Sequence, residues 1–283
     1  MPHPAMAKDN VAVITGGASG IGLAAAMHFA ALGMRVCIAD IGDDALKAAE
    51  PKLSAASPGG GANIMTTRVD VSNRDELTAL EAAVQKRFGG TDILMNNAGI
   101  SPGAKMFGPL ENWQRLLAVN LWGVIHGTQV FAPHMIERGR TGLIINTGSK
   151  QGITTPPGEP AYNVSKAGVK AFTEALQHEL RNTEGCKISA HLLIPGHVFT
   201  RLTARGRTEK PPGAWTGEQT VDFMIKSLEA GDFYILCPDN DVPRSLDERR
   251  MLWAIGDIVE NRPALSRWHP DYAEAFAAFA RKG

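Results

Sequence analysis

Short apolar runs alternate with longer helical segments along most of this chain of 283 residues. Such runs, bounded by glycine and polar residues, are typical of parallel strands that are buried on both faces. The expected strands cover residues 11–15, 34–39, 63–69, 92–95, 143–146, 188–194 and 233–237. The expected helices cover residues 21–32, 43–53, 75–88, 111–138 (interrupted near Pro133) and 161–181. Strict alternation predicts an α/β fold, a doubly wound parallel sheet of about seven strands with helices on both faces.

No internal repeat and no linker rich in Pro, Gly or Ser interrupts the sequence, so we expect residues 1–283 to form a single domain. Residues 239–283 continue beyond the last expected strand as a helical extension. Within it, residues 245–248 match a capping box that would open a helix. An aromatic stripe at helical spacing follows, formed by Tyr272, Phe276 and Phe279. The stripe is expected to pack against the rest of the chain, against a neighbouring subunit, or as a wall of a ligand pocket.

Composition narrows the possible partners. Apolar residues make up 44% of the chain, which is enough for a sizeable core. The 29 basic and 29 acidic residues balance and form no basic run, which argues against nucleic acid and membrane surfaces as partners. Residues 1–10 lack an apolar signal core, and the 3 cysteines are far apart, so we expect a cytoplasmic protein with reduced thiols. No H-x-x-x-H or C-x-x-C pattern appears, so no metal site is predicted.

A glycine-rich turn stands between the first expected strand and the first expected helix. Residues 15–22 read TGGASGIG, with the spacing G-x-x-x-G-x-G. Glycines let the backbone approach a diphosphate closely, and a helix N-terminus presents free N–H groups to its negative charge. The G-x-x-x-x-G-K-[ST] pattern of nucleotide triphosphatases is absent from the sequence. The turn therefore predicts a dinucleotide site in a Rossmann-like fold.

Asp40 ends the second expected strand, eighteen residues after Gly22. An acidic residue at about this distance accepts hydrogen bonds from the adenosine ribose hydroxyls and repels a 2′-phosphate. Neither Gly17 nor Ile41 supplies a cation that would attract this phosphate. The pattern predicts NAD as the cofactor, while a helix-capping aspartate is the alternative.

Tyr162 and Lys166 stand four residues apart, and Ser149 precedes the tyrosine by thirteen positions. A four-residue step places both side chains on one face of a helix. A lysine ammonium near a phenol favours the ionised phenolate and so lowers the pKa of the tyrosine. The pattern predicts a general acid and base that works at neutral pH beside a nucleotide, a combination that indicates hydride transfer.

Taken in order, these motifs resemble those of the short-chain dehydrogenase/reductase family over residues 8–238. The matching residues are Thr15–Gly22, Asp70, Val71, Asn96–Gly99, Asn120, Ser149, Tyr162–Lys166, Pro195 and Gly196. Ordered agreement over this length is far more specific than any single motif.

The resemblance implies a role for each matching residue. Tyr162 would donate and accept the proton, and Lys166 would bind the nicotinamide ribose. Ser149 would orient the substrate oxygen, and Asn120 would hold a water that links Lys166 to solvent. The implied cofactor-binding residues are Gly16, Ser19, Gly20, Ile21, Gly22, Asp40, Ile41, Asp70, Val71, Asn97, Ala98, Gly99, Tyr162, Lys166, Pro195, Gly196, Val198 and Thr200.

Some residues near the matching motifs depart from the family pattern or lie outside it. Gly148 stands where the family often has a serine, and Lys150 directly follows Ser149. Lys150 could touch a polar substrate, but we expect it to point to solvent. His197, beside the implied nicotinamide site, is expected to be structural or exposed rather than catalytic. Residues 200–232 correspond to the part of the family that covers the substrate, and a surface connection is the alternative.

The leading functional hypothesis is an NAD-dependent oxidoreductase that acts on a secondary alcohol or ketone. An NADPH-dependent ketoacyl-type reductase and a non-catalytic nucleotide-binding scaffold are the alternatives. Trp215, Trp253 and Trp268 fall in the covering segment and the extension, so we expect a substrate with a substantial apolar body. The family commonly pairs its two long helices across subunits, which here implies a homotetramer.

Overall fold

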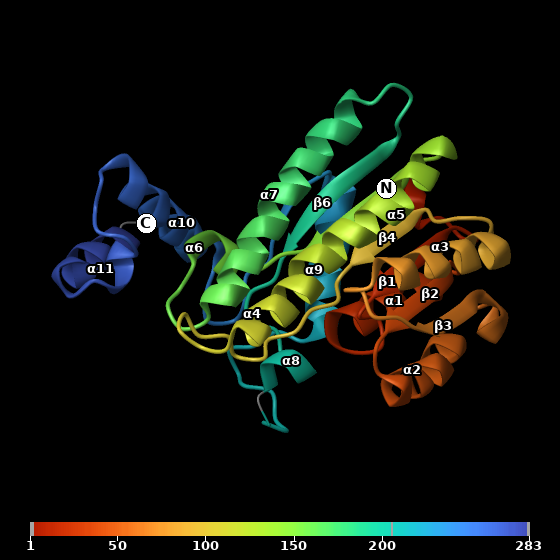
Figure 1. Cartoon of the computed structure of the whole chain (residues 1–283), viewed down its shortest axis with the longest axis horizontal. Helices are drawn as coiled ribbons and strands as arrows, with labels where there is room; N and C mark the ends of the chain where they lie inside the picture. Colours follow the sequence, from red (N-terminus) through yellow and green to blue (C-terminus); the bar gives the residue numbers. More distant parts are fainter. Residues whose placement is uncertain (1–2, 205, 282–283) are drawn as a thin grey trace.

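The computed structural model describes residues 3–204 and 206–281 of the chain. Its centre is a parallel sheet of seven strands within these residues, in the order β3-β2-β1-β4-β5-β6-β7 (Figure 1). The strands are β1 Val11–Thr15, β2 Arg35–Asp40, β3 Ile64–Arg68, β4 Ile93–Asn96, β5 Gly142–Thr147, β6 Ile188–Ile194 and β7 Tyr234–Leu236. The predicted doubly wound α/β fold is therefore confirmed.

Helices cover both faces of this sheet. The helices are α1 Gly20–Ala31, α2 Asp43–Ala56, α3 Arg74–Phe88, α4 Leu110–Leu117, α5 Gly123–Glu137, α6 Gln151–Thr154, α7 Pro160–Asn182, α8 Arg201–Ala204, α9 Gly217–Ala230, α10 Arg244–Val259 and α11 Ala273–Arg281. Side chains of α1, α2 and α9 form the core on one face, and those of α3, α5 and α7 form the core on the other. Over the described ranges, none of the helices is both long and apolar enough to cross a membrane.

Burial on both faces explains the unbroken apolar runs of the central strands. In β1, Ile14 joins the core beneath α1, whereas Val13 joins the core beneath α3 and α5. Successive side chains of a strand point to opposite faces, so a strand covered on both sides needs apolar residues at every position. All five residues of β1 are buried.

The predicted helix over residues 111–138 is interrupted, but not near Pro133. Pro133 lies inside α5, and the break is a π-helical turn, Ala118–Trp122, that joins α4 to α5. Asn120 is fully buried in this turn. Its side chain accepts a hydrogen bond from the backbone N–H of Ile100 at 2.8 Å and donates one to the Ile100 carbonyl at 2.9 Å. A π turn is a common feature beside functional sites, and here it turns Asn120 toward the loop after β4.

The segment expected to cover a substrate, residues 200–232, divides into two parts. Helix α9 packs against α1, and its side chains Val221, Met224 and Leu228 belong to the main core. A capping box between Thr216 and Gln219 starts this helix. Helix α9 is thus a structural layer of the fold, and only the part of the segment before α9 is placed to cover a ligand.

The C-terminal extension forms α10 and α11 at one end of the molecule, beside α6 (Figure 1). The predicted capping box over residues 245–248 is wrong, because α10 begins at Arg244 after Pro243 and has no side-chain cap. Glu248 instead pairs with Arg244 at the surface. The Asp247 side chain turns inward and is buried.

The aromatic stripe packs inside the extension. Phe276 and Phe279 have ring centroids 5.4 and 5.3 Å from that of Trp253. The Trp253 indole donates a hydrogen bond to Ser266 at 2.8 Å, and the Arg262 guanidinium lies 4.1 Å from its ring centroid. Trp253 is therefore the centre of a small core that the extension builds for itself.

Candidate active site

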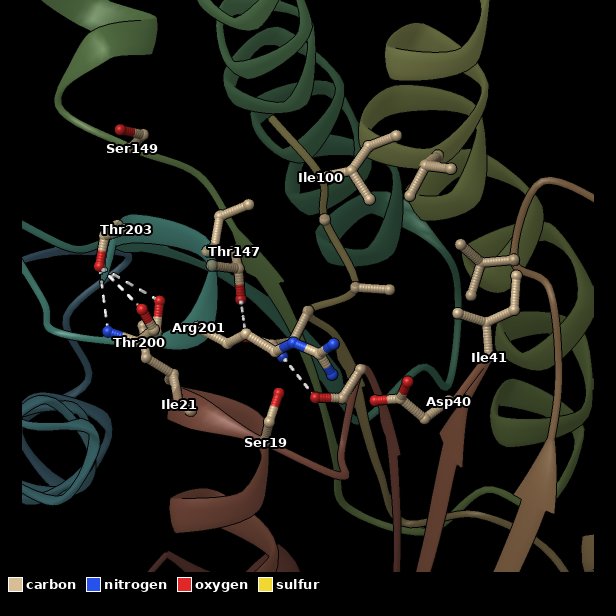
Figure 2. Close-up of a pocket in the computed structure, with 18 of the residues that line it drawn as sticks. Ser19, Ile21, Asp40, Ile41, Ile100, Thr147, Ser149, Thr200, Arg201 and Thr203 are labelled. Carbon is tan, nitrogen blue, oxygen red and sulfur yellow. Dashed lines mark hydrogen bonds between the residues drawn. The ribbon is translucent and has the colours of Figure 1, made fainter. Parts of the chain in front are cut away.

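A cavity of about 520 Å³ opens at the carboxyl edge of the sheet (Figure 2). It lies where β1 and β4 are neighbours, which is the point at which the strand order reverses. Open parallel sheets bind ligands at such switch points, because the loops that follow the two strands diverge there. The loops after β1 to β6 all contribute to its wall.

Most of the residues predicted from the sequence lie on this wall. They are Gly16, Ser19, Gly20, Ile21, Asp40, Ile41, Asp70, Val71, Asn97, Ala98, Gly99, Ser149, Tyr162, Lys166, Pro195, Gly196, Val198 and Thr200. Gly22 and Asn120 are the two that do not line it. Gly22 lies against the carbonyl of Gly16, where a side chain would not fit, so it shapes the turn from behind.

The glycine-rich turn leaves backbone N–H groups available at the cavity. Gly16 and Gly20 have φ angles of 63° and 55°, which favour glycine. Ser19 precedes α1 but gives it no side-chain cap. Within the described ranges, the N–H groups of Gly20 and Ile21 donate to no protein acceptor. A helix N-terminus with free N–H groups fits the negative charge of a diphosphate.

Hydrogen bonds hold the loop after β4 against the turn after β1. The Asn97 side chain donates to the carbonyls of Thr15 and Gly16 at 3.2 and 3.3 Å. The same side chain accepts a hydrogen bond from the Thr147 hydroxyl at 3.2 Å (Figure 2). Asn97 therefore connects the ends of β1, β4 and β5, and it keeps the floor of the cavity rigid.

Asp40 stands at the end of β2 with its carboxylate fixed by the backbone. One oxygen accepts a hydrogen bond from Ala18 N–H and the other from Gly42 N–H, both at 3.2 Å. Ile41 beside it is 57% exposed and also lines the cavity. Each carboxylate oxygen retains a lone pair, so the pair can accept hydrogen bonds from two ribose hydroxyls.

At the other end of the cavity, Ser149 follows β5, and Tyr162 and Lys166 lie on the first turns of α7. Lys166 donates a hydrogen bond to the Thr147 carbonyl at 2.7 Å, and its Nζ is 5.8 Å from the Tyr162 ring centroid. The Ser149 hydroxyl accepts a hydrogen bond from Gln151 N–H at 3.2 Å and forms another with Tyr162. The three side chains predicted to act together are therefore neighbours.

The structure reverses the predicted direction of one pKa shift. Burial raises the pKa of Tyr162 to about 12, with a smaller opposing effect from the Ser149 hydrogen bond. Burial also lowers the pKa of Lys166 to about 8. Removal from water penalises both the phenolate and the ammonium, and this penalty outweighs the attraction between them that the sequence pattern predicted.

The sequence did not indicate several residues of the wall. Thr147 and Ile100 lie beside matched motifs, so their neighbours in the sequence could have pointed to them. Arg115 reaches the wall from α4, and no local pattern marks it. Arg201, by contrast, belongs to the segment that was expected to cover the substrate, and its exposed side chain extends from α8 into the cavity (Figure 2).

Two expectations about the surroundings of the site are wrong. Lys150 does not point to solvent, because it turns toward the buried carboxylates of Asp239 and Asp247 and forms ion pairs with both. None of Trp215, Trp253 and Trp268 lines this cavity. Trp215 packs against Phe223 and donates its indole hydrogen bond to Asn240, while the other two lie in the extension.

His197 lies outside the cavity wall with an exposed side chain, as expected of a residue without a catalytic role. Over the part of the chain that the structure describes, no cluster of three His, Cys, Asp or Glu residues could hold a metal ion.

Comparison with known proteins shows which family this chain is similar to. A family model described as short chain dehydrogenase matches residues 10–211. The chain is 34% identical to 3beta-hydroxysteroid dehydrogenase 2 of Eggerthella lenta over 202 residues, which span 71% of this chain and 75% of that protein. It is 29% identical to 1-deoxy-11-beta-hydroxypentalenate dehydrogenase of Streptomyces exfoliatus, across 92% and 94% of the two chains. A crystal structure of a short chain dehydrogenase/reductase from Burkholderia phymatum in complex with NAD superposes with a TM-score of 0.81 at 31% identity, across 92% and 98% of the two chains.

The buried Lys166 predicts a pH dependence of stability. Its pKa falls from 10.5 to about 8 on folding, so between these values the unfolded chain binds a proton that the folded protein has lost. The free energy of unfolding therefore rises with pH in this window. The pKa of Tyr162 is raised above its ordinary value of 10.0, so its contribution to the free energy of unfolding falls with pH, but only above pH 10.

Urea unfolding of the wild type and of Lys166→Met at about pH 7.5 and about pH 9.5 measures this contribution. We expect the free energy of unfolding of the wild type, relative to the variant, to be larger at the higher pH. A difference that does not change with pH would contradict the lowered pKa of Lys166.

Proposed function

The chain belongs to the short-chain dehydrogenase/reductase family, and we propose that it transfers a hydride between NAD(H) and a secondary alcohol or ketone. The observation that carries the proposal is the convergence of Ser149, Tyr162 and Lys166 at one end of a cavity that has Asp40 on its wall. The glycine-rich turn lies on the same wall and fits a diphosphate. One cavity thus has the features for a dinucleotide and for proton transfer.

In the proposed mechanism, Tyr162 is the general acid and base. NAD(H), when bound, supplies or accepts the hydride at the nicotinamide ring. During reduction, the Tyr162 hydroxyl gives its proton to the substrate oxygen, and during oxidation the tyrosine takes that proton back. At neutral pH the hydroxyl is protonated, as an ordinary phenol would be, and this is the form that gives the proton during reduction.

The neighbours of Tyr162 orient the reacting groups. The Ser149 hydroxyl is proposed to hydrogen-bond to the substrate oxygen, beside the tyrosine that it already contacts. Lys166 is proposed to bind the nicotinamide ribose while its ammonium donates to Thr147. We propose that Asn120 contributes through Ile100, whose backbone it holds at the cavity wall, and that it holds a water that connects Lys166 to solvent.

The proposal names NAD because the Asp40 carboxylate lies on the cavity wall, where it would accept hydrogen bonds from ribose hydroxyls and would repel a 2′-phosphate. The Asp40 oxygens already accept hydrogen bonds from Ala18 and Gly42, so the carboxylate cannot easily turn away from a phosphate. The related structure from Burkholderia phymatum is a complex with NAD. Arg201, which extends into the same cavity, is the observation that favours NADPH and the ketoacyl-type reductase alternative.

The substrate is proposed to have a substantial apolar body, although the tryptophans that first suggested it lie elsewhere. The apolar side chains of Ile100, Val198 and Leu202 line the cavity. One relative is named for a hydroxysteroid. Arg201 is the cation that could instead hold a carboxylate, so a panel of ketones with and without carboxylates distinguishes the two substrate classes.

Replacing Tyr162 tests both the enzymatic function and the scaffold alternative. Tyr162→Phe keeps the ring but removes the transferable proton, so we expect kcat to fall by about 10²–10⁴-fold. The dissociation constant for NADH, measured by fluorescence, should change little. Tyr234→Phe is the matched control, because Tyr234 is exposed and its hydroxyl bonds to Glu174 away from the cavity. Near-normal kcat in Tyr162→Phe would assign the proton to another group.

Cofactor titrations test the role of Asp40. We expect the wild type to bind NADH at least about tenfold more tightly than NADPH, because the carboxylate repels the 2′-phosphate. Asp40→Asn should reduce this ratio. Asp44→Asn, which makes the same charge change at an exposed position outside the cavity wall, should preserve it. Equal affinities in the wild type would favour the NADPH-dependent alternative.

We also propose that the chain assembles as a homotetramer. Trp122, after α4, and Val164, on α7, are about half exposed. Large apolar side chains at such positions are often covered by a partner subunit. Light scattering at micromolar concentration should give four times the mass of one chain, and a monomer mass would contradict this prediction.

A further inference from the structure

A buried cluster of charges lies directly behind Ser149. Lys150, the next residue, has its Nζ 2.5 Å from a carboxylate oxygen of Asp247 and 3.3 Å from one of Asp239. The three side chains are only 15%, 4% and 5% exposed, in the order Lys150, Asp247, Asp239. Arg250 completes this Lys150 cluster, with its guanidinium 3.9 Å from Asp247. Two cations and two carboxylates thus share a site where an unpaired charge would be costly.

The Lys150 cluster also touches the loop that follows β6. The same Asp239 oxygen that faces Lys150 accepts a hydrogen bond from His197 N–H at 3.1 Å. Gly196 lies so close that a Cβ at this position would be 2.5 Å from Asp239 and 2.9 Å from Lys150. This loop lines the cavity through Gly196, so the cluster connects two walls of the active site.

Asp239 and Asp247 come from different parts of the chain. Asp239 follows β7, and its second oxygen accepts hydrogen bonds from the N–H groups of Asp241 and Val242. Asp247 lies in the first turn of α10, in the C-terminal extension. The extension therefore supplies the shortest contact to the residue that follows Ser149.

Backbone hydrogen bonds around Ser149 explain how the ion pair between Lys150 and Asp247 could affect the position of the Ser149 hydroxyl. The carbonyl of Ser149 accepts a hydrogen bond from Gly152 N–H, and its hydroxyl accepts one from Gln151 N–H. The carbonyl of Lys150 accepts hydrogen bonds from Ile153 and Thr154 at the start of the short helix α6. A helix of four residues has little stability of its own, so the fixed Lys150 side chain restrains the whole turn.

From these contacts we infer that Asp247 and Asp239 are positioning residues for Ser149 and act through Lys150. The C-terminal extension therefore contributes to the active site through Asp247. The inference rests on the proposed function, since Ser149 has its role in substrate orientation there. Misplacement of a reacting group by about 1 Å can cost about 10²-fold in rate, so a distant carboxylate can matter to catalysis.

A second contact of α10 distinguishes a positioning role of Asp247 from a role in holding α10 against the rest of the chain. Met251, one turn after Asp247, packs against an apolar cluster that includes Val169 and Leu192. This contact keeps α10 against the main domain when the charge of Asp247 is removed. Removing the Asp247 charge should therefore displace the turn that contains Ser149 and should not detach the extension.

The test compares Asp247→Asn with Glu248→Gln. Both variants remove one carboxylate charge from the first turns of α10, but Glu248 is exposed, and its one ion pair within the described residues is with Arg244 at the surface. We expect Asp247→Asn to lower kcat by about tenfold or more while the dissociation constant for NADH stays within about twofold. Glu248→Gln should change neither. Lys150→Met should reproduce the loss of kcat, and Lys150→Arg, which keeps the charge, should recover part of it.

Wild-type kcat in Asp247→Asn would overturn the inference. So would a loss of kcat accompanied by an equal loss of NADH affinity, because that pattern reports general damage to the fold.

Hydrogen exchange provides a readout that needs no substrate. In Asp247→Asn, the amides of residues 150–155 should exchange faster than in the wild type, whereas in Glu248→Gln they should not. Unchanged exchange in Asp247→Asn would refute the inference on its own. If the wild type oxidised or reduced none of the substrates tested, the proposed function would fail, and the exchange experiment would still decide whether Asp247 holds the Ser149 turn.

Discussion

Parallel strands can be joined only by crossovers, and this constraint places the candidate active site. Because every strand runs in the same direction, the carboxyl ends of β1 to β6 meet at one edge of the sheet. The loops that leave this edge bring together residues as distant in sequence as Gly16 and Thr200. The helices that make the crossovers bury both faces of the sheet, which keeps the cavity walls rigid. The site is thus a consequence of the topology as much as of its own residues.

Two lysines near the end of β5 show how different partners change the role of a largely covered cation. Lys166 receives one carbonyl as its hydrogen-bond partner, and burial lowers its pKa to about 8. Lys150 receives two carboxylates and becomes the centre of an ion cluster. Burial beside a neutral carbonyl lowers the pKa of Lys166, whereas Lys150 forms ion pairs with the carboxylates that surround it. Both lysines lie close to Ser149: Lys150 follows it in the chain, and Lys166 donates a hydrogen bond to the carbonyl of Thr147.

The seven strands and helices α1, α2, α3 and α7 could be predicted because their signals are local, whereas α6, α8 and α9 were not predicted. A short apolar run between glycines, or a helix closed by Gly33, depends on residues that are neighbours in the sequence. The break at Ala118–Trp122 could not be found in this way, since it forms where Asn120 reaches the backbone of Ile100. The aromatic stripe of the extension was visible in the sequence, but its partner, Trp253, became clear only in the structure.

Sequence alone determined the order of the elements, the glycine-rich turn, and the spacing that joins Tyr162 and Lys166 on one helix face. These features depend on backbone geometry and on residues close in the chain, which a linear pattern records. Tertiary structure alone decided the direction in which the pKa of Tyr162 moves and the place of Lys150 between carboxylates from the loop after β7 and from α10. Burial and charge pairing depend on groups that folding brings together from distant positions in the chain, so no local sequence pattern predicts them.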